Sequence, residues 1–445
     1  MIDKRYIILM MVMSLLPNLP SAARTVLIST AGELRAFAQS VNAGCSYKGE
    51  TVQLAQDVFL NDTTGWQRWD SIPDKKRKQW TPIGHMESVD SIVTFQGTFD
   101  GKGHSIYGLY IYRGGSGVLQ GLFGVVENAT VRNVSVKASV IVGHAYVGGI
   151  VAYALNASMI DNCHNYGKVT GTRNHVGGVV ASFDSWSSLF VTNCSNHGNI
   201  NGKCMVGGLI GTLYIESVRD SEKERKGGVV VLNCYNRGYV IGYSNVGGIV
   251  GVGRIAAGKK TTDMLCNCYN TGEIVAQFVA GGICGTLDIW CYADHFINKE
   301  YYGRPLFSNN YHAGTVSIVY STAVDPLVGN GELSAYAEYD FDMLLAKYSS
   351  PCYYALPVSV KPLQKRDLVD GAGRNVTITS PKHFLHLPPE DMQTDDFVDR
   401  LNGFVDEQNG FTEKQKGFVE KHGASYKRWR KDTEGVNGGF PVFAE

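Results

Sequence analysis

The amino-acid sequence predicts an all-β protein, a parallel β-helix with three short strands in each coil. Three observations lead to this prediction: one pattern of residues repeats along the chain, apolar and polar residues alternate inside each copy, and 52 of the 445 residues are glycine. Ordinary chains contain about 7% glycine, so the excess indicates many tight turns and close backbone approaches.

The repeat lies between residues 130 and 320, and its clearest copy reads NCYNRGYVIGYSNVGGIVG at 233–251. All copies open on an asparagine; they begin at Asn133, Asn162, Asn193, Asn233, Asn267 and Asn309. Most successive copies lie about 30 to 40 residues apart, a period typical of stacked repeats. The gaps differ because insertions such as SVRDSEKERKGG at 217–228 follow the glycine pairs. These insertions are therefore expected at one end of one face.

Each copy contains three extended pieces: the Asn-Cys stretch, a Gly-x-Val-x-Gly stretch and a Val-Gly-Gly stretch. In the middle piece one position is always apolar and β-branched: Val169, Ile200, Val240, Ile274 and Val316. The position before it is mixed and mostly polar, which is the period-2 signature of a strand with one buried face. No helical stripe is present, and a β-sandwich would not repeat one unit. Stacked units would place equivalent residues about 4.8 Å apart.

Residues 1–23 have the pattern of a secretory signal peptide. Lys4 and Arg5 precede an apolar segment of about a dozen residues, and small residues precede an expected cleavage after Ala23. The alternative is a buried N-terminal strand. No second apolar run long enough to span a membrane occurs. We therefore expect an exported protein without a transmembrane segment in the mature chain, located outside the cell, on its surface or in the periplasm.

The remainder divides into three parts: 24–115, an N-terminal cap with the first coils; 116–320, the repeat region; and 321–445, a mixed α/β closing region. Thr30 and Glu33 form a capping-box pattern and predict a helix after Thr30. A second helix is predicted over 394–405 with Thr394 as its N-cap. Both helices are expected to cover open ends of the stack, where strand edges would otherwise be unpaired.

The VGGIVG and VGGLIG sequences, GLFG at 121–124 and TFDGKGHSIYGL at 98–109 resemble the motifs of GLUG-motif proteins. That family is known from exported proteins of Bacteroidetes and from surface IgA-peptidase-type proteins. The segments DMQTDDFVDRLN at 391–402 and NGGFPVF at 437–443 also resemble a tail that closes many such chains. The resemblance implies a right-handed β-helix on an exported protein, often one in adhesion, and implies no established reaction.

Two columns of the repeat are expected to be structural. Cysteines at one position of four copies should form an inward core column: Cys163, Cys194, Cys234 and Cys268. Cysteine packs well as a small buried residue, while disulfides and a metal site are the alternatives. Asparagines two residues before a glycine should adopt a turn and hydrogen bond between coils: Asn165, Asn196, Asn236 and Asn270.

The charge balance and the motifs argue against several functions. The chain has 41 basic and 41 acidic residues, so no basic field favours a nucleic-acid partner. No His-Glu-x-x-His motif, phosphate-binding loop or metal-ligand cluster is found, and no cofactor is expected. Asp100 and His104 are interpreted as a tight turn. A polysaccharide lyase or hydrolase would need clustered carboxylates, which only the insertions could supply.

The residue after each cysteine should point outward and form an aromatic stripe through Tyr235, Tyr269 and Tyr311, with Arg237 beside it. Such a stripe could bind glycans or host and surface proteins, or merely stabilise the stack. Trp186 and Trp290 in insertions are further candidate contacts. The sequence thus favours a non-enzymatic adhesion or binding protein. A carbohydrate-active enzyme and a structural stalk or assembly subunit are the alternatives.

Overall fold

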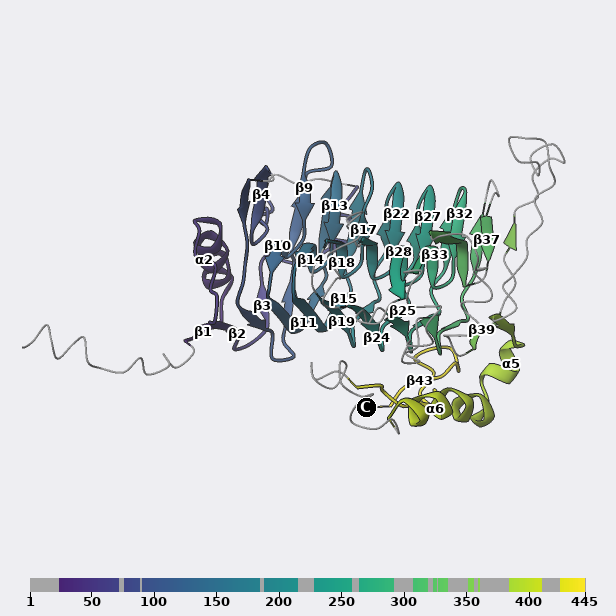
Figure 1. Ribbon diagram of the computed structural model, residues 1–445. Helices are drawn as coiled ribbons and strands as arrows, with labels where there is room; N and C mark the ends of the chain where they lie inside the picture. The colour runs from purple at the N-terminus through teal and green to yellow at the C-terminus, as the bar shows by residue number, and fades with distance from the viewer. Residues whose placement is uncertain are drawn as a thin grey trace, which may run out of the picture.

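The computed structural model describes most of the chain between residues 24 and 444. The described ranges are 24–71, 76–88, 90–184, 188–214, 228–257, 264–291, 307–318, 323–325, 327–334, 351–355, 359–360, 384–409 and 425–444. The expected signal peptide at 1–23 lies outside them. Figure 1 shows strands from successive parts of the chain side by side along one long axis, with helix α2 (Ala31–Asn42) at one end.

The strands form long parallel sheets. In the described residues the largest has 17 strands, and three others have seven, eight and seven. The large sheet contains β1 (Thr25–Ile28), β2 (Thr51–Leu54), β3 (Val58–Phe59), β6 (Thr98–Asp100), β7 (Ser105–Tyr107), β11 (Thr130–Lys137), β15 (Ser158–Asn165), β19 (Leu189–Thr192), β20 (Ser195–Asn196), β24 (Val229–Leu232), β25 (Tyr235–Asn236), β29 (Met264–Cys266), β30 (Tyr269–Asn270), β34 (Phe307–Ser308), β35 (Tyr311–His312), β39 (Cys352–Tyr354) and β41 (Phe384–His386).

The other three sheets each take one strand from every repeat. One runs from β8 (Tyr110–Tyr112) through β12 (Val140–Gly143), β16 (Lys168–Gly171), β21 (Ile200–Asn201), β26 (Val240–Ile241), β31 (Ile274–Ala276) and β36 (Val316–Ile318) to β40 (Ser359–Val360). The second holds β9 (Val118–Gln120), β13 (Ala145–Gly148), β17 (Val176–Gly177), β22 (Cys204–Gly207), β27 (Ser244–Gly247), β32 (Val279–Gly281) and β37 (Ala323–Asp325). The third holds β10 (Phe123–Glu127), β14 (Val151–Leu155), β18 (Val180–Asp184), β23 (Ile210–Tyr214), β28 (Val250–Ala257), β33 (Cys284–Cys291) and β38 (Val328–Ser334).

The third extended piece differs from the expectation, because in the copies with a glycine pair it bends at that pair into two strands in different sheets. In the copy at Asn162 these are β17 and β18, with Gly178 between them. A Cβ at Gly178 would lie 2.1 Å from the Gly208 carbonyl oxygen and 2.7 Å from Oδ1 of Asn196. The Val-Gly-Gly sequence is therefore a corner at which only glycine lets neighbouring repeats approach.

The parallel pairing is not confined to 116–320. It begins at β1, which pairs with β2, and continues beyond residue 320 to β41, which pairs with β39. Two short antiparallel pairs lie outside the stack: β4 (His85–Ser88) with β5 (Ser91–Val93), and β42 (Trp429–Arg430) with β43 (Val442–Phe443). A one-turn 3-10 helix, η1, spans Trp66–Arg68.

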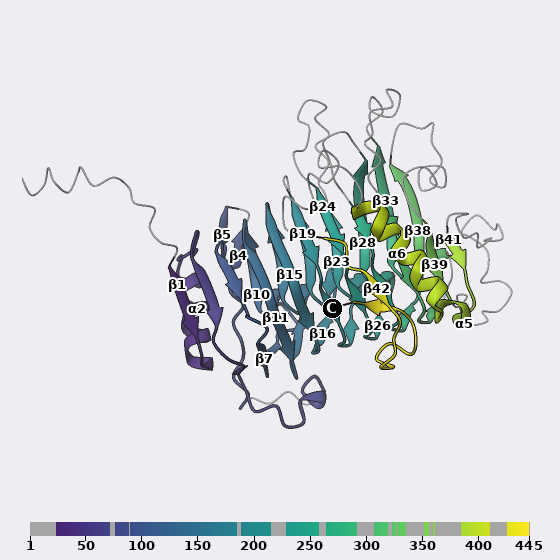
Figure 2. The same cartoon turned by 90° about the horizontal axis from the view of Figure 1, so that it is seen from below.

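The N-terminal helix is confirmed. Thr30 caps α2 in a capping box with Glu33, and Leu34, Phe37, Ala38 and Val41 are buried. The second predicted helix is also present as α6 (Asp395–Asn409), preceded by α5 (Pro389–Met392), and Thr394 accepts a hydrogen bond from the Phe397 N–H. Its expected place is wrong, however. Figures 1 and 2 show α6 lying along the outer side of the large sheet, not over the end of the stack.

The predicted asparagine ladder is confirmed. Nδ2 of Asn165 donates to Oδ1 of Asn196 at 2.8 Å, and the same bond joins Asn196 to Asn236 and Asn236 to Asn270 at 2.8 and 2.7 Å. Each Oδ1 also accepts from the N–H of the glycine two residues later, as in Gly167. All four asparagines are fully buried. The side chains thus close the turn and fix the register between repeats.

The four repeated cysteines line the core, all with 0% exposure, and all are free thiols. Each follows an asparagine with positive φ, between 51° and 56°. Each Sγ lies near the carbonyl oxygen two residues earlier, at 3.4, 3.2, 3.3 and 3.1 Å for Cys163, Cys194, Cys234 and Cys268. The thiol is small and apolar, yet it supplies a weak donor to a carbonyl beside the left-handed turn.

We predict that iodoacetamide leaves these four cysteines unmodified in the native protein and modifies them in denaturing urea without any reductant. They are inaccessible, and burial raises the pKa of Cys194 and Cys268, which disfavours the reactive thiolate. Peptide mass spectrometry measures the modification at each position. Modification that requires prior reduction would show that the column is bridged.

The asparagine ladder ends at a histidine. Nδ1 of His312 lies 2.9 Å from Nδ2 of Asn270, and Nε2 of His312 is buried without a hydrogen-bond partner in the described structure. Burial lowers the pKa of His312 to about 4. The native state therefore holds a neutral imidazole, while the unfolded chain binds a proton below its ordinary pKa of about 6.5. This difference makes the folded state less stable as pH falls from about 6.5 to about 4.

We predict that His312→Asn stabilises the protein, because an asparagine two residues before Gly314 would repeat the ladder motif and extend it by one rung. Removing the unpaired Nε2 should raise the free energy of unfolding at pH 7 by about 1 kcal/mol. The loss of stability between pH 6.5 and 4 should also become smaller. Urea unfolding at several pH values measures both effects. His386→Asn, at an exposed position, is the matched control; equal behaviour of the two variants would contradict the prediction.

Candidate binding surface

The residues that follow the cysteines form one column on the outer side of the large sheet, as expected. His164 pairs with Ser195, Ser195 with Tyr235, Tyr235 with Tyr269, Tyr269 with Tyr311, and Tyr311 with Tyr353. The rings of Tyr235 and Tyr269 are 4.8 Å apart and inclined by 2°, and those of Tyr269 and Tyr311 are 5.1 Å apart and inclined by 4°. The tyrosines therefore stack face over face.

The expected use of this stripe as an exposed binding surface is wrong for Tyr269 and Tyr311, while Tyr235 is half-buried. Tyr269 and Tyr311 are 1% and 0% exposed, because the chain's own C-terminal segment, residues 387–409 and 425–444, lies on them. Trp429 packs 5.8 Å from the Tyr269 ring and 5.5 Å from the Tyr311 ring. The stripe is an aromatic core between the large sheet and this segment, which matches the alternative of a stabilising ladder.

The other predicted contact residues are Arg237, Trp186 and Trp290. Arg237 lies 4.8 Å above the Tyr235 ring and donates a hydrogen bond from Nη2 to the Tyr269 hydroxyl at 2.7 Å, so it belongs to the covered ladder. Trp186 lies outside the described residues, and Trp290 is described only as part of β33, without its side chain.

A second column on the same face stays open. It contains Phe59, Tyr107, Lys137, Tyr166 and His197, here named the open stripe. Phe59 stacks on Tyr107 at 4.6 Å, Tyr166 stacks on His197 at 4.4 Å, and Nζ of Lys137 lies 5.9 and 5.3 Å from the Tyr107 and Tyr166 rings. Phe59 and Tyr166 are 59% and 37% exposed. Figure 2 shows that α6 and β42 lie over the later strands of the sheet; among the described residues, they leave β7, β11 and β15 uncovered.

A signal for the open stripe is present in the sequence, although the repeat pattern alone did not reveal it. Tyr166 and His197 occupy the middle of an Asn-x-Gly turn, and the same position in later copies holds Arg237, Thr271 and, in the His-Ala-Gly sequence of the last copy, Ala313. The side chain at this position is large in the early copies and small in the late ones. The late positions lie beneath the C-terminal segment: Ala313 belongs to the buried cluster formed with it, and Thr271 bonds to Asn437. A size gradient along one column thus marks where the face is covered.

Between the two columns, His164 and His197 are joined through Ser195. Nε2 of His164 is 3.0 Å from Oδ1 of Asn162, Nδ1 is 2.8 Å from Oγ of Ser195, and Oγ is 3.1 Å from Nε2 of His197. Burial, together with Lys427 and Lys137, lowers the pKa of His164 to about 4, and burial with Arg237 does the same for the pKa of His197. The arrangement resembles a nucleophile with bases, but Ser195 is 0% exposed, so it is a neutral hydrogen-bond chain.

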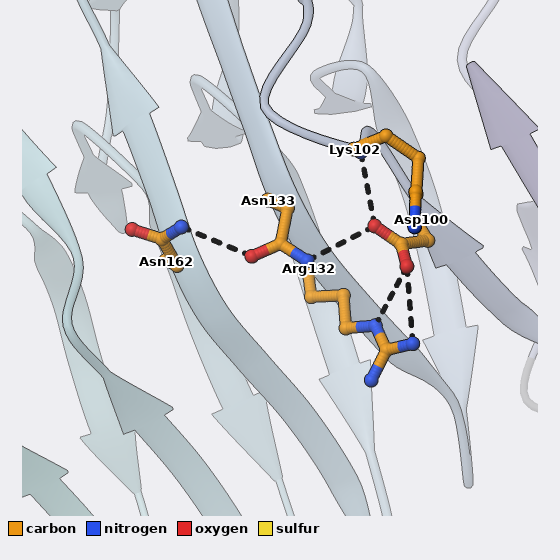
Figure 3. A network of polar contacts seen from close by, with 5 residues as sticks. All are labelled: Asp100, Lys102, Arg132, Asn133 and Asn162. Carbon is orange, nitrogen blue, oxygen red and sulfur yellow. Dashed lines mark hydrogen bonds and ion pairs between the residues drawn. The ribbon is translucent and has the colours of Figure 1, made fainter. Parts of the chain in front are cut away.

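Asp100 is an enclosed carboxylate near this face, with 2% exposure. Its Oδ1 accepts from the Lys102 N–H at 2.9 Å and from Nδ2 of Asn133 at 3.0 Å, and its Oδ2 accepts from Nε and Nη2 of Arg132 at 3.1 and 3.0 Å (Figure 3). Burial alone would raise the pKa of Asp100, but these donors hold it below its usual value. Both oxygens are occupied, so the geometry favours the tight-turn interpretation over acid–base chemistry.

His104 belongs to a different pair, since its Nδ1 lies 3.6 Å from Oδ1 of Asp57. No group of three or more His, Cys, Asp or Glu side chains is placed to hold a metal ion in the part of the chain that the structure describes. Within the same residues, no helix combines the length and the apolar character needed to cross a membrane.

Comparison with known proteins gives no relative for this chain. No family model, curated protein or solved structure matches it.

We predict unequal effects on stability for two tyrosines of this face. Tyr269→Ala should lower the free energy of unfolding by about 3–5 kcal/mol, because it removes a buried aromatic side chain between two stacked rings and the C-terminal segment. Tyr166→Ala should change it by no more than about 0.5 kcal/mol, since that ring is 37% exposed. Urea titration measures both. Equal losses of stability would contradict the difference between the covered column of Tyr269 and the open stripe of Tyr166.

Proposed function

We propose that this chain is an exported, non-catalytic protein that acts in adhesion by binding glycans or proteins on its outer face. We further propose that its fold is a right-handed parallel β-helix of the GLUG-motif type. Parallel pairing repeated from β1 to β41 and the glycine corners of each repeat support the fold. The motifs at 98–109 and 121–124 support the family.

The observation that carries the functional proposal is the open stripe. Its rings are held by a continuous sheet, so little side-chain freedom is lost when a ligand binds. Phe59 and Tyr166 are exposed to solvent, and Lys137, which lies between the rings of Tyr107 and Tyr166, adds a positive charge and hydrogen-bond donors. Aromatic faces combined with polar groups are typical of contacts that dominate binding energy. The contact surface thus moves from Tyr235, Tyr269 and Tyr311 to the neighbouring column.

The alternative is a polysaccharide lyase or hydrolase, and the site argues against it. Such chemistry needs a pair of carboxylates or carboxylates with calcium and a base. The carboxylate of Asp100 has both its oxygens bound by Arg132, Asn133 and Lys102. Asp161 accepts from Thr192 and Asn193 at 2.6 and 2.7 Å. Both carboxylates thus accept hydrogen bonds that stabilise the fold. Assaying the release of sugar products tests the enzyme alternative directly.

We predict that the double variant Tyr107→Ala/Tyr166→Ala binds mucin-coated and cell surfaces at least about tenfold more weakly than wild type, since it removes two of the aromatic faces, each a loss of order 1 kcal/mol. Tyr112→Ala/Tyr243→Ala is the matched control, because those tyrosines are 37% and 41% exposed and lie outside the open stripe. Surface plasmon resonance measures the binding.

Wild-type binding by the open-stripe variant would overturn the placement of the site. Absence of wild-type binding to every such surface would overturn adhesion. In parallel, wild-type protein incubated with polysaccharides should release no unsaturated or reducing sugar ends; their appearance would establish the enzyme alternative.

A further inference from the structure

The C-terminal segment shows what the large sheet can hold. The asparagines that open the repeats form a second ladder along the outer side of the sheet, and three of them bind the segment. Nδ2 of Asn233, Asn267 and Asn309 donates to the carbonyl oxygens of Ser425, Lys427 and Leu401 at 2.7, 3.0 and 3.1 Å. The Lys427 N–H in turn donates to Oδ1 of Asn233 at 3.0 Å. The ladder thus recognises peptide backbone.

Successive rungs of this ladder meet alternate residues of the docked peptide. Asn233 binds at Ser425 and Asn267 binds at Lys427, while Nε1 of Trp429 donates to Oδ1 of Asn267 at 2.7 Å. In an extended chain, alternate residues present their groups to the same side. Alternate residues of a fully extended chain lie about 6.7 Å apart and neighbouring rungs about 4.8 Å apart, so a peptide that follows the ladder is open but not fully extended. Its side chains reach the neighbouring aromatic column, as Trp429 reaches Tyr269.

Beneath the C-terminal segment, both N–H donors of each asparagine side-chain amide are used. Besides its peptide carbonyl, Nδ2 of Asn233 donates to Asn193 at 3.2 Å, that of Asn267 to Asn233 at 2.8 Å, and that of Asn309 to Asn267 at 2.7 Å. An asparagine amide has two N–H donors. One donor therefore runs along the ladder, and the other holds the peptide.

The same column of asparagines continues onto the open part of the face, with one Nδ2 donor of each amide unused among the described residues. The chain of amide–amide bonds is interrupted between Asn193 and Asn162, because Asn193 donates to Asp161. Nδ2 of Asn162 donates to Asn133 at 3.0 Å, that of Asn133 to Asp100 at 3.0 Å, and that of Asn193 to Asp161 at 2.7 Å (Figure 3 shows the first two bonds). In the described structure these are their Nδ2 hydrogen bonds, and the three side chains are half-buried. All three have the positive φ of the covered members.

We propose that the open part of the face binds an extended polypeptide segment of a protein partner in the way that the covered part binds the chain's own C-terminal segment. Backbone carbonyls of the partner accept from Asn133, Asn162 and Asn193, and its side chains lie on Tyr166 and Lys137 of the open stripe. This inference rests on the proposed function and names the ligand class. A glycan ligand is the competing outcome, and the docked peptide is the observation that favours a polypeptide.

The probe is a fluorescent peptide with the sequence of residues 425–432, SYKRWRKD, which contains the backbone that the ladder already holds. Fluorescence anisotropy with the full chain should give saturable binding at least about tenfold tighter than a scrambled peptide of the same composition. Asn162→Gly should weaken it by about tenfold, the effect expected from losing a rung with two hydrogen bonds. Glycine tolerates the positive φ of this position.

Asn156→Gly is the matched control, since Asn156 has a φ of 54° and bonds to Glu127, away from this ladder. Asn162→Asp repeats the test with the donors removed and the side-chain shape kept, and it decides the question if Asn162→Gly unfolds. Weaker peptide binding in the Asn162 variant, with wild-type binding in Asn156→Gly, supports the inference. Equal binding by all variants, or no preference over the scrambled peptide, overturns it.

The two proposals fail separately. If surfaces are bound through Tyr107 and Tyr166 but the peptide is not, and if enzymatic removal of glycans abolishes surface binding, the ligand is a glycan; the polypeptide inference then fails while the proposed function stands. If neither peptide nor surface is bound, both fail.

Discussion

Side-chain amides that hydrogen bond from one repeat to the next set the register on which the rest of the structure depends. The inner ladder, Asn165 to Asn270, closes each Asn-x-Gly turn and links it to its neighbour. The outer ladder links Asn193, Asn233, Asn267 and Asn309, which all have the left-handed backbone of the turn that opens each repeat. A one-residue slip would reverse every side chain between core and surface. With two ladders in register, the cysteines stay inside and the tyrosines outside.

The outer side of the large sheet serves two purposes along its length. Toward the C-terminal end its aromatic column becomes an interior, because Trp429 and the apolar side of α6 bury it. Toward the N-terminal end the same sheet presents the open stripe and three asparagines that, in the described structure, keep an unused amide donor. The same aromatic and amide side chains therefore explain how the sheet holds the chain's own C-terminal segment and why its exposed part suits an extended ligand.

The sequence allowed much of this to be predicted, because a repeat averages out local ambiguity. Alternation around Val169 and its counterparts identified strands, and the Asn-x-Gly spacing identified the ladder. The candidate site was predicted less well. Tyr269 was correctly placed in a stack but not recognised as buried, since nothing in its own repeat records a segment that follows much later in the chain. The open stripe includes Phe59 and Tyr107, which precede the regular copies and show no repeat pattern, so the repeat does not predict it.

The sequence by itself determined the strands, the turns, the inward cysteines and the outward tyrosines, because these follow from the period of the repeat and the conformational preferences of asparagine and glycine. Only the tertiary structure decided which part of the outer face is a core and which is a surface. That decision depends on where α6 and Trp429 pack, which is a long-range contact between apolar side chains and carries no local period.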